Sequence, residues 1–210
     1  MSDLKKNWVG EKMDISNQER SVLKKIIASR RSIFPKQFTG DTIPDQIIAE
    51  LLDLAHMAPN HKNTMPWRYF VYSGKSLRAL LDFKKEFYLK KTPADMVKKT
   101  KLQAFEDRKE QASHIIAIVN HKNESVNLLK WEELAAVSCS VQNICLSLHS
   151  YGIGGYWSTG NLAGSQEIRD YLNLSDNEEF MGFLYLGVPV AGAAEVNREP
   201  IGNRVKWMNK

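Results

Sequence analysis

Three short polar clusters, each at the end of an apolar segment, hold the side chains that could bind a ligand. The first is Arg30-Arg31-Ser32, whose two guanidinium groups and hydroxyl can grip a phosphate through charge-assisted hydrogen bonds. The second is the loop from Pro59 to Trp67, in which His61 can bond a planar ligand. The third runs from Gly154 to Gly160, where glycines let the backbone approach a ligand that hydroxyls and aromatic rings can contact.

Each cluster also has a purely structural interpretation. Arg30-Arg31 can be a solvated basic doublet. His61 can be an ordinary loop histidine, and the glycine-rich segment can be a helix cap followed by a turn. No single cluster distinguishes a ligand-binding role from a structural one. The interpretation therefore depends on the three clusters together.

Several familiar catalytic motifs are missing from the sequence. Gly155 and Gly160 have the spacing of phosphate-loop glycines, but Asn161-Leu162 follows where Lys and Ser or Thr are required. There is no GxGxxG that opens a helix after a strand, no HExxH and no GxSxG, and the five histidines are scattered. We therefore expect no Rossmann dinucleotide site and no metal ion, and the usual routes to acyl or phosphoryl transfer have no support, so we name no catalytic side chain from these motifs.

Length and composition indicate one globular domain. The chain has 210 residues, of which 43% are hydrophobic and 25% charged, and its net charge of +5 suits anionic ligands. We expect a single domain over residues 1–210, with extensions at 1–18 and 191–210, in which Pro200 and Trp207 are candidate anchors. The N-terminus lacks the apolar core of a signal peptide and no segment is apolar enough to span a membrane, which predicts a cytoplasmic protein.

The stretch from Trp131 to Gly160 is the element around which the others are organised. Apolar residues recur there at gaps of three and four, and no Asp, Glu, Lys or Arg occurs from Leu134 through Tyr151. Such a helix must be enclosed on most sides, by its own domain or by a second subunit. Gly152 suits the left-handed position that ends it. Cys139 and Cys145, six apart on this helix, are expected to be buried free thiols.

The remaining segments alternate between the helical and the extended pattern. Because strands are few and separated by long helical excursions, helices packed over one central sheet, an α+β fold, fit better than a doubly wound array. Helical spacing begins at Glu19, at Pro44 and at Gln166, and again over Lys75–Gln111, which Pro93 divides. Strands are predicted at Trp67–Tyr72, His114–Val119 and Met181–Pro189, the last buried on both faces.

Taken together, the clusters resemble the nitroreductase family of flavin enzymes, in its compact single-domain branch. Their order and spacing match from about Arg20 to Pro189. The segments that carry the resemblance are Ser29-Arg30-Arg31-Ser32, Ala58-Pro59-Asn60-His61-Lys62, Pro66-Trp67-Arg68-Tyr69-Phe70-Val71, Gly154-Gly155-Tyr156-Trp157-Ser158-Thr159-Gly160 and Gly182-Phe183-Leu184-Tyr185-Leu186-Gly187-Val188-Pro189.

The resemblance implies an α+β fold with a central mixed, mostly antiparallel sheet flanked by helices, in a domain-embracing homodimer with FMN at the interface. The long uncharged helix would then pack along the dimer axis. Residues expected to bind FMN are Arg30, Arg31 and Ser32 at the phosphate and ribityl chain, His61, Trp157, Ser158 and Thr159 around the flavin, and Arg198 at the phosphate, with Arg204 as its substitute. One departure is Met57, where the branch can carry a flavin-contacting arginine.

The implied activity is transfer of hydride from NADH or NADPH through FMN to a small electron acceptor, such as a nitroaromatic or a quinone, by a ping-pong mechanism. The basic segment from Lys84 to Arg108 would cover the flavin, with Phe87, Tyr88 and Phe105 shaping the acceptor pocket and lysines such as Lys90 and Lys91 favouring NADPH. The alternative for this segment is solvated helical faces.

Two other function classes stay open. One is a flavin-binding sensor or storage protein without reductase turnover. The other is a nucleic-acid binder that uses the lysines of residues 84–101, although the segment lacks interleaved base-stacking aromatics and nearby acidic residues offset its charge. We therefore expect no nucleic-acid partner and no membrane partner.

Overall fold

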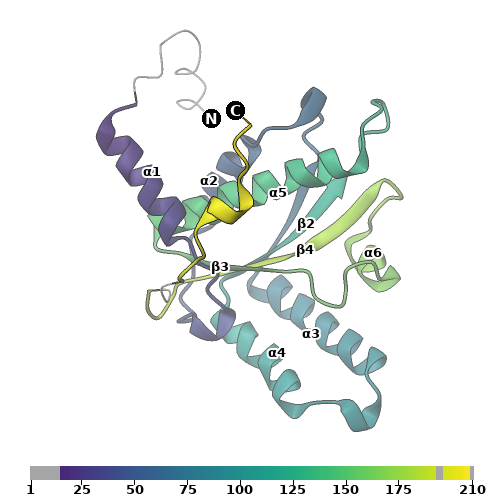
Figure 1. Cartoon of the computed structure of the whole chain (residues 1–210). Coiled ribbons are helices and arrows are strands. Elements are labelled where there is room, and N and C mark those ends of the chain that lie inside the picture. The colour runs from purple at the N-terminus through teal and green to yellow at the C-terminus, as the bar shows by residue number, and fades with distance from the viewer. Residues whose placement is uncertain (1–14, 193–195, 209–210) are drawn as a thin grey trace. The chain divides into compact units, whose positions relative to one another are not determined.

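The computed structural model describes residues 15–192 and 196–208 (Figure 1). Residues 1–14, most of the expected N-terminal extension, lie outside this range, as do 193–195 and 209–210 of the C-terminal one. The chain divides into two compact units, residues 1–30 and residues 31–210, which are described separately.

The first unit contributes one described helix, α1 (Asn17–Ser29). It begins two residues before Glu19, the predicted start, because Ser16 and Glu19 form a capping box: the Glu19 amide donates to Ser16 Oγ at 3.2 Å, and the Ser16 amide donates to Glu19 Oε2 at 2.8 Å. None of its residues is buried, and Val22 and Ile27 are both about half exposed. The helix, taken by itself, therefore shows an apolar stripe.

The second unit is built on a four-stranded sheet in the order β1-β2-β4-β3. All three strand pairings are antiparallel, which confirms the expected mostly antiparallel sheet. The strands are β1 (Trp67–Ser73), β2 (His114–His121), β3 (Gly154–Ser158) and β4 (Glu178–Gly187).

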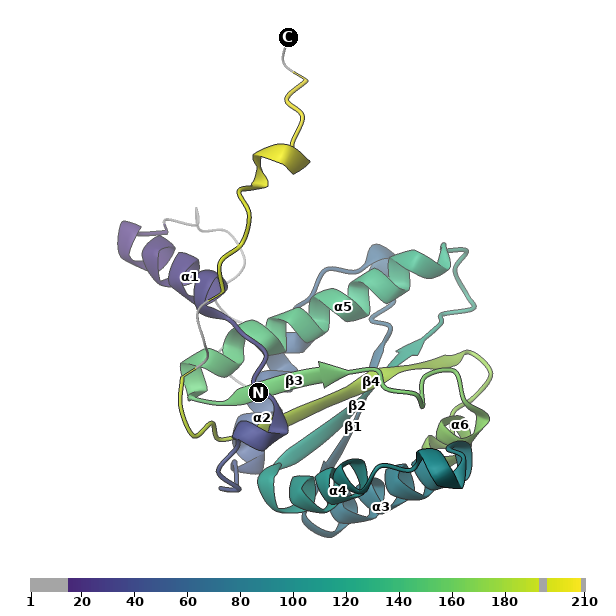
Figure 2. The same cartoon turned by 60° about the horizontal axis from the view of Figure 1, so that its bottom comes forward.

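Helices cover both faces of this sheet (Figure 2). Side chains alternate along β2, so Ile116 and Ile118 pack on one face while Ile115, Ala117 and Val119 pack on the other. One face is covered by α2 (Asp45–His56) and α5 (Lys130–Ser147), and the other by α3 (Gly74–Lys91), α4 (Lys99–Gln111) and α6 (Gln166–Leu172). The α+β prediction is confirmed.

The glycine-rich segment after α5 is a strand, where the sequence predicted a turn. Its glycines are required by packing. A Cβ at Gly155 would lie 2.4 Å from the Leu148 side chain, and one at Gly154 would lie 2.9 Å from the ring of Phe38. Both positions therefore exclude any larger residue while β3 pairs with β4.

The long helix α5 is continued by a short 3-10 helix, η4 (Leu148–Tyr151), and ends as predicted at Gly152, whose φ is +66°. Val137, Val141 and Ile144 are buried, but the opposite face is open in the single chain. Cys139 lies on that open face and is exposed, so the expectation of two buried thiols is wrong for this residue.

Candidate functional site

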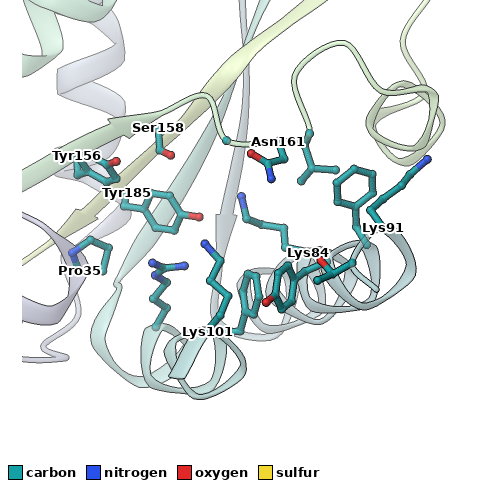
Figure 3. A pocket seen from close by; sticks show the side chains of 15 residues that line it. Pro35, Lys84, Lys91, Lys101, Tyr156, Ser158, Asn161 and Tyr185 are labelled. Atoms are coloured by element: carbon teal, nitrogen blue, oxygen red, sulfur yellow. The ribbon is translucent and has the colours of Figure 1, made fainter. Parts of the chain in front are cut away.

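A cavity of about 240 Å³ lies on the α3–α4 side of the sheet, where β3 ends (Figure 3). Walls come from both helices, from the two neighbouring strands β3 and β4, and from the loop that follows β3. Its lining residues are Pro35, Lys84, Phe87, Tyr88, Lys91, Thr92, Lys101, Phe105, Arg108, Tyr156, Ser158, Gly160, Asn161, Leu162 and Tyr185.

Strand pairing positions the sheet side of the cavity. Tyr156 and Ser158 point to the same face because they are two residues apart on β3. Tyr185 lies directly opposite Tyr156 on β4, with ring centroids 6.4 Å apart. Gly160, at φ +62°, then turns the chain so that Asn161 also borders the cavity.

The two helices bring cations to the cavity. The Lys84 ammonium of α3 lies 3.8 Å from the centroid of the Phe183 ring, and the Arg108 guanidinium of α4 lies 5.8 Å from the rings of both Phe105 and Tyr185. No Asp or Glu is among the lining residues, and within residues 15–192 and 196–208 no carboxylate forms an ion pair with Lys84, Lys101 or Arg108. The cavity therefore carries uncompensated positive charge.

This surplus charge affects the lysine that is most enclosed. Burial lowers the pKa of the Lys84 ammonium from its ordinary 10.5 to about 7, and repulsion from Arg108 and Lys101 adds to the shift. Burial also raises the pKa of Tyr185 to about 12, which leaves its hydroxyl protonated as a hydrogen-bond donor. A negatively charged ligand would relieve the repulsion among the cations.

Of the residues predicted from the glycine-rich cluster, the structure brings only Ser158 into the cavity. Trp157 points to the opposite face of the sheet, where its Nε1 donates to the Met181 carbonyl at 3.1 Å. Gly182 makes room for that indole, because a Cβ there would lie 2.8 Å from Nε1. Thr159 is exposed and does not line the cavity.

The first cluster is divided between the two units. Arg30 is the C-cap of α1 and belongs to the first unit, whereas Arg31 and Ser32 open the second. The Ile33 amide donates to the Gly155 carbonyl at 3.0 Å, which fixes this segment against β3, and Pro35 reaches the cavity two residues later. Ser32 is exposed beside this anchor.

His61 lies on the side of α5, away from the cavity. Its Nδ1 is 3.2 Å from Glu132 Oε1, and the imidazole is mostly exposed. Lys62, Asn63 and Met65 in the same loop adopt positive φ values of 53°, 52° and 44°. Such backbone strain in residues other than glycine is concentrated at ligand-binding and switch segments.

The other predicted positions are exposed. Met57 ends α2 with 63% of its surface accessible, and Arg198 lies exposed in the segment 196–208. Arg204 contacts Glu199 at 3.3 Å. Trp207 is 80% exposed, so its predicted anchoring role is wrong for the single chain.

Sequence reasoning missed the convergence of Lys84, Lys101 and Arg108. It placed Phe87, Tyr88 and Phe105 around a pocket, and these do line the cavity. One signal was available: Lys84 continues the buried stripe of Leu77, Leu80 and Leu81 at helical spacing, so a lysine occupies a position that faces the core.

A Ser-His-Asp chain, in which Ser113 and His114 are buried and Asp45 is exposed, has a structural role. Ser113 Oγ is 2.9 Å from His114 Nδ1, and His114 Nε2 is 2.9 Å from Asp45 Oδ1. Ser113 Oγ also accepts from the Ile43 amide at 2.7 Å, and neither Ser113 nor His114 lines the cavity. The chain of bonds thus ties α2 to β2.

Among the residues described, no cluster of His, Cys, Asp or Glu is suited to hold a metal ion, and no helix is long and apolar enough to cross a membrane.

Comparison with known proteins gives a consistent result. The curated relative "Putative NAD(P)H nitroreductase YfhC" of Bacillus subtilis (strain 168) is 32% identical over 190 residues, which cover 90% of this chain and 96% of the relative. The solved structure of a nitroreductase-like family protein from Bacillus cereus is 22% identical, with a TM-score of 0.76 and coverage of 96% of this chain and 100% of that one.

A second solved structure, a mutant of the FMN and NADPH-dependent nitroreductase NfnB from sphigopyxis sp. strain HMH, is 16% identical, with a TM-score of 0.70 and coverage of 90% and 99%. At these identities the two structures establish the shared fold. A sequence profile described as "Nitroreductase family" matches residues 27–188, most of the chain. The resemblance noted from the sequence is thereby confirmed: the chain belongs to the nitroreductase family.

Proposed function

We propose that the protein is an FMN-dependent oxidoreductase that passes hydride from NADH or NADPH to a small electrophilic acceptor. The observation that carries the proposal is the cavity beside Ser158, which combines uncompensated cations with aromatic walls. The names of the relatives support it, since YfhC is called an NAD(P)H nitroreductase and NfnB an FMN and NADPH-dependent one.

The residues present fit a flavin. Its ring system has carbonyl and nitrogen acceptors at one edge, and the cavity supplies donors from Lys84, Lys101, Arg108 and Ser158. About 240 Å³ is below the roughly 300–1,000 Å³ of pockets that enclose a whole drug-sized ligand, so the cavity suits part of FMN. The assignment of Arg30, Arg31, Ser32 and Arg198 to the phosphate and ribityl chain stays a prediction.

FMN, when bound, supplies the chemistry of hydride acceptance and donation. The chain would supply position and charge: Ser158 would donate from the end of β3, and the cations would favour negative charge in the cavity. No side-chain acid or nucleophile is assigned. Because NAD(P)H and the acceptor would meet the same ring, one must leave before the other binds, which predicts ping-pong kinetics. Nitroaromatics and quinones are the proposed acceptors.

We also infer a homodimer. The exposed, uncharged face of α5 and the open apolar stripe of α1 both support a second copy as their cover. His61 and Ser158 do not share a cavity within one chain, so a flavin that contacts both requires residues from two subunits. Light scattering should report twice the chain mass, and a stable monomer that retains FMN would contradict the inference.

The proposed function is tested by the visible spectrum of the purified full chain, followed by turnover. We expect FMN near one per subunit, oxidation of NADH or NADPH in the presence of a quinone, and parallel double-reciprocal lines. Ser158→Ala should raise the FMN dissociation constant roughly twofold to tenfold, which is the effect expected for the loss of one hydrogen bond. Ser125→Ala, in an exposed loop, is the control.

The alternatives give different results. Bound FMN without NAD(P)H turnover would support the sensor or storage function instead. If the purified chain binds no FMN, the proposed function is contradicted. Nucleic-acid binding is disfavoured because several of its lysines are already paired: Lys85 lies 2.7 Å from Glu106, and Lys91 lies 2.9 Å from Glu167. The cytoplasmic location stays a prediction from the sequence.

A further inference from the structure

We propose that Glu132 is a positioning residue, which fixes the orientation and the tautomer of His61 so that His61 presents Nε2 to FMN as a hydrogen-bond acceptor. The inference rests on the proposed function, because it concerns how the chain prepares one of the residues expected around the flavin. FMN offers donors for such a nitrogen, namely an N–H of its ring system and the hydroxyls of its ribityl chain.

The loop that carries His61 is held at both of its ends. Before the loop, Ser140 Oγ of α5 donates to the Ala55 carbonyl at 2.7 Å, in the last turn of α2. After the loop, where β1 begins, the Pro66 carbonyl accepts from the His121 amide at 2.7 Å. Because the ends are fixed in this way, the position of His61 depends on the contacts that the middle of the loop makes.

Glu132 makes the one hydrogen bond that reaches the middle of this loop from elsewhere in the described part of the chain. The other hydrogen bonds of residues 61–65 have partners within residues 60–68; the Met65 amide, for example, donates to Asn60 Oδ1 at 3.0 Å. Three residues of the loop have positive φ values, which cost free energy in residues other than glycine. The surroundings must therefore hold the loop in this conformation, and Glu132 contributes to that.

The Glu132 carboxylate is itself held in place. Its Oε2 accepts from the Leu129 amide at 3.0 Å and thereby caps the start of α5, and only 24% of the side chain is exposed. Its other oxygen, Oε1, lies 3.2 Å from His61 Nδ1. Because capping already fixes the rotamer of the carboxylate, the bond to His61 costs little additional conformational entropy.

The same contact determines which ring nitrogen of His61 carries the proton. An ionised carboxylate only accepts hydrogen bonds, so Nδ1 has to be the donor. Nε2 of the neutral ring is then an acceptor. The side chain is 54% exposed and Nε2 makes no hydrogen bond to the described residues, so this nitrogen is available to a ligand. Without the carboxylate, a neutral imidazole in water favours the proton on Nε2, which would turn this nitrogen into a donor.

The test compares Glu132→Gln with the parent full chain. A glutamine at this helical position still caps the Leu129 amide through its oxygen, but it then turns an amide donor toward His61. The variant therefore keeps the helix cap and removes the acceptor for Nδ1. Glu19→Gln is the matched control, because Glu19 holds the same capping position in α1 and bonds to Ser16 in place of a histidine. Circular dichroism checks that each variant folds.

The first readout is the nitrogen NMR spectrum of His61 in the flavin-free chain, assigned with His61→Ala and recorded at about pH 9, where an unperturbed imidazole is neutral. The parent should carry the proton mainly on Nδ1, and Glu132→Gln should carry it mainly on Nε2. Glu19→Gln should match the parent. A residue that only capped α5 would leave this spectrum unchanged when Gln replaces it.

The second readout is a double-mutant cycle on the FMN dissociation constant. Glu132→Gln should raise this constant roughly threefold to tenfold, as for the loss of one hydrogen bond. Adding Glu132→Gln to His61→Ala should raise it no further, because Glu132 acts through His61 and the two effects are not additive. Glu19→Gln should leave the constant unchanged.

The proposal is overturned if the parent chain carries the proton mainly on Nε2, if Glu132→Gln leaves the tautomer unchanged, or if the two substitutions weaken FMN binding independently. The tautomer of the parent chain decides even if a variant does not fold. Failure of the proposed function looks different, because the parent chain would then bind no FMN. In that case the tautomer alone decides whether Glu132 positions His61.

Discussion

Replacing Lys84 with Met should stabilise the flavin-free protein and weaken the binding of anions in the cavity. Lys84 is partly buried beside two other cations, and burial together with repulsion from those cations lowers its pKa from 10.5 to about 7. A charge kept in such surroundings costs folding free energy, whereas a methionine of similar length fills the same space without that cost.

The pKa values in the folded and unfolded states set the free-energy cost of the Lys84 charge and the direction in which stability changes with pH. A difference of about 3.5 pKa units corresponds to about 5 kcal/mol, at about 1.36 kcal/mol per unit, as an upper estimate because Lys84 borders the cavity. At pH 7 the folded lysine is about half protonated, and between pH 7 and 10.5 it loses its proton while the unfolded one keeps it, so the unfolded state binds more protons and stability rises with pH. The penalty is about 4 kcal/mol at pH 7 and about 2 kcal/mol at pH 9.

Urea unfolding of the flavin-free full chain at pH 7 and at pH 9 measures this effect. Lys84→Met should be more stable than the parent at pH 7, and its advantage should shrink by about 2 kcal/mol at pH 9. Lys85→Met, which removes a lysine that pairs with Glu106 outside the cavity, should show no such change between the two pH values. The reasoning is refuted if Lys84→Met is less stable than the parent at pH 7, or if its advantage is the same at both pH values.

Three further predictions address the fold, the dimer and the nicotinamide. Gly155→Ala should destabilise the protein by about 1–3 kcal/mol in chemical denaturation, since its Cβ would lie 2.4 Å from the Leu148 side chain; unchanged stability would mean that the strand shifts freely. Cys139→Arg should convert a dimer to monomers in light scattering and release FMN, and an intact dimer would place the interface elsewhere. Lys91→Ala should leave the ratio of KM for NADPH over NADH unchanged, because the Lys91 ammonium already pairs with Glu167 at 2.9 Å; a several-fold rise would assign it to the extra phosphate.

Local patterns in the sequence were sufficient for most of the elements. The 3.6-residue period located α2 and α5, and Gly152 marked the end of the long helical run because few other residues adopt a left-handed backbone. Short apolar runs located β1, β2 and β4. The family also followed from the sequence, since the order and spacing of short motifs along the chain do not depend on how it folds.

β3 shows where local patterns were insufficient. Its run of Gly, aromatic and hydroxyl residues looked like a turn, because two of its positions are glycines that only the packing against Leu148 and Phe38 requires. Successive side chains of a strand point to opposite faces of the sheet, so Trp157 and Ser158 lie on different faces. The sequence had predicted that both contact the same ligand. The same limit applies to Cys139, whose exposure depends on which face of α5 meets the sheet.

The sequence by itself therefore determined the family, the α+β class and the candidate motifs, because each of these depends on residue type and short-range spacing. Only the tertiary structure decided that Lys84, Lys101 and Arg108 share a cavity with Ser158. These residues come from α3, α4 and β3, and their proximity arises from the packing of the helices on the antiparallel sheet. Contacts between residues so far apart in the chain leave no periodic signal in the sequence, so the charge of the site became visible only in the fold.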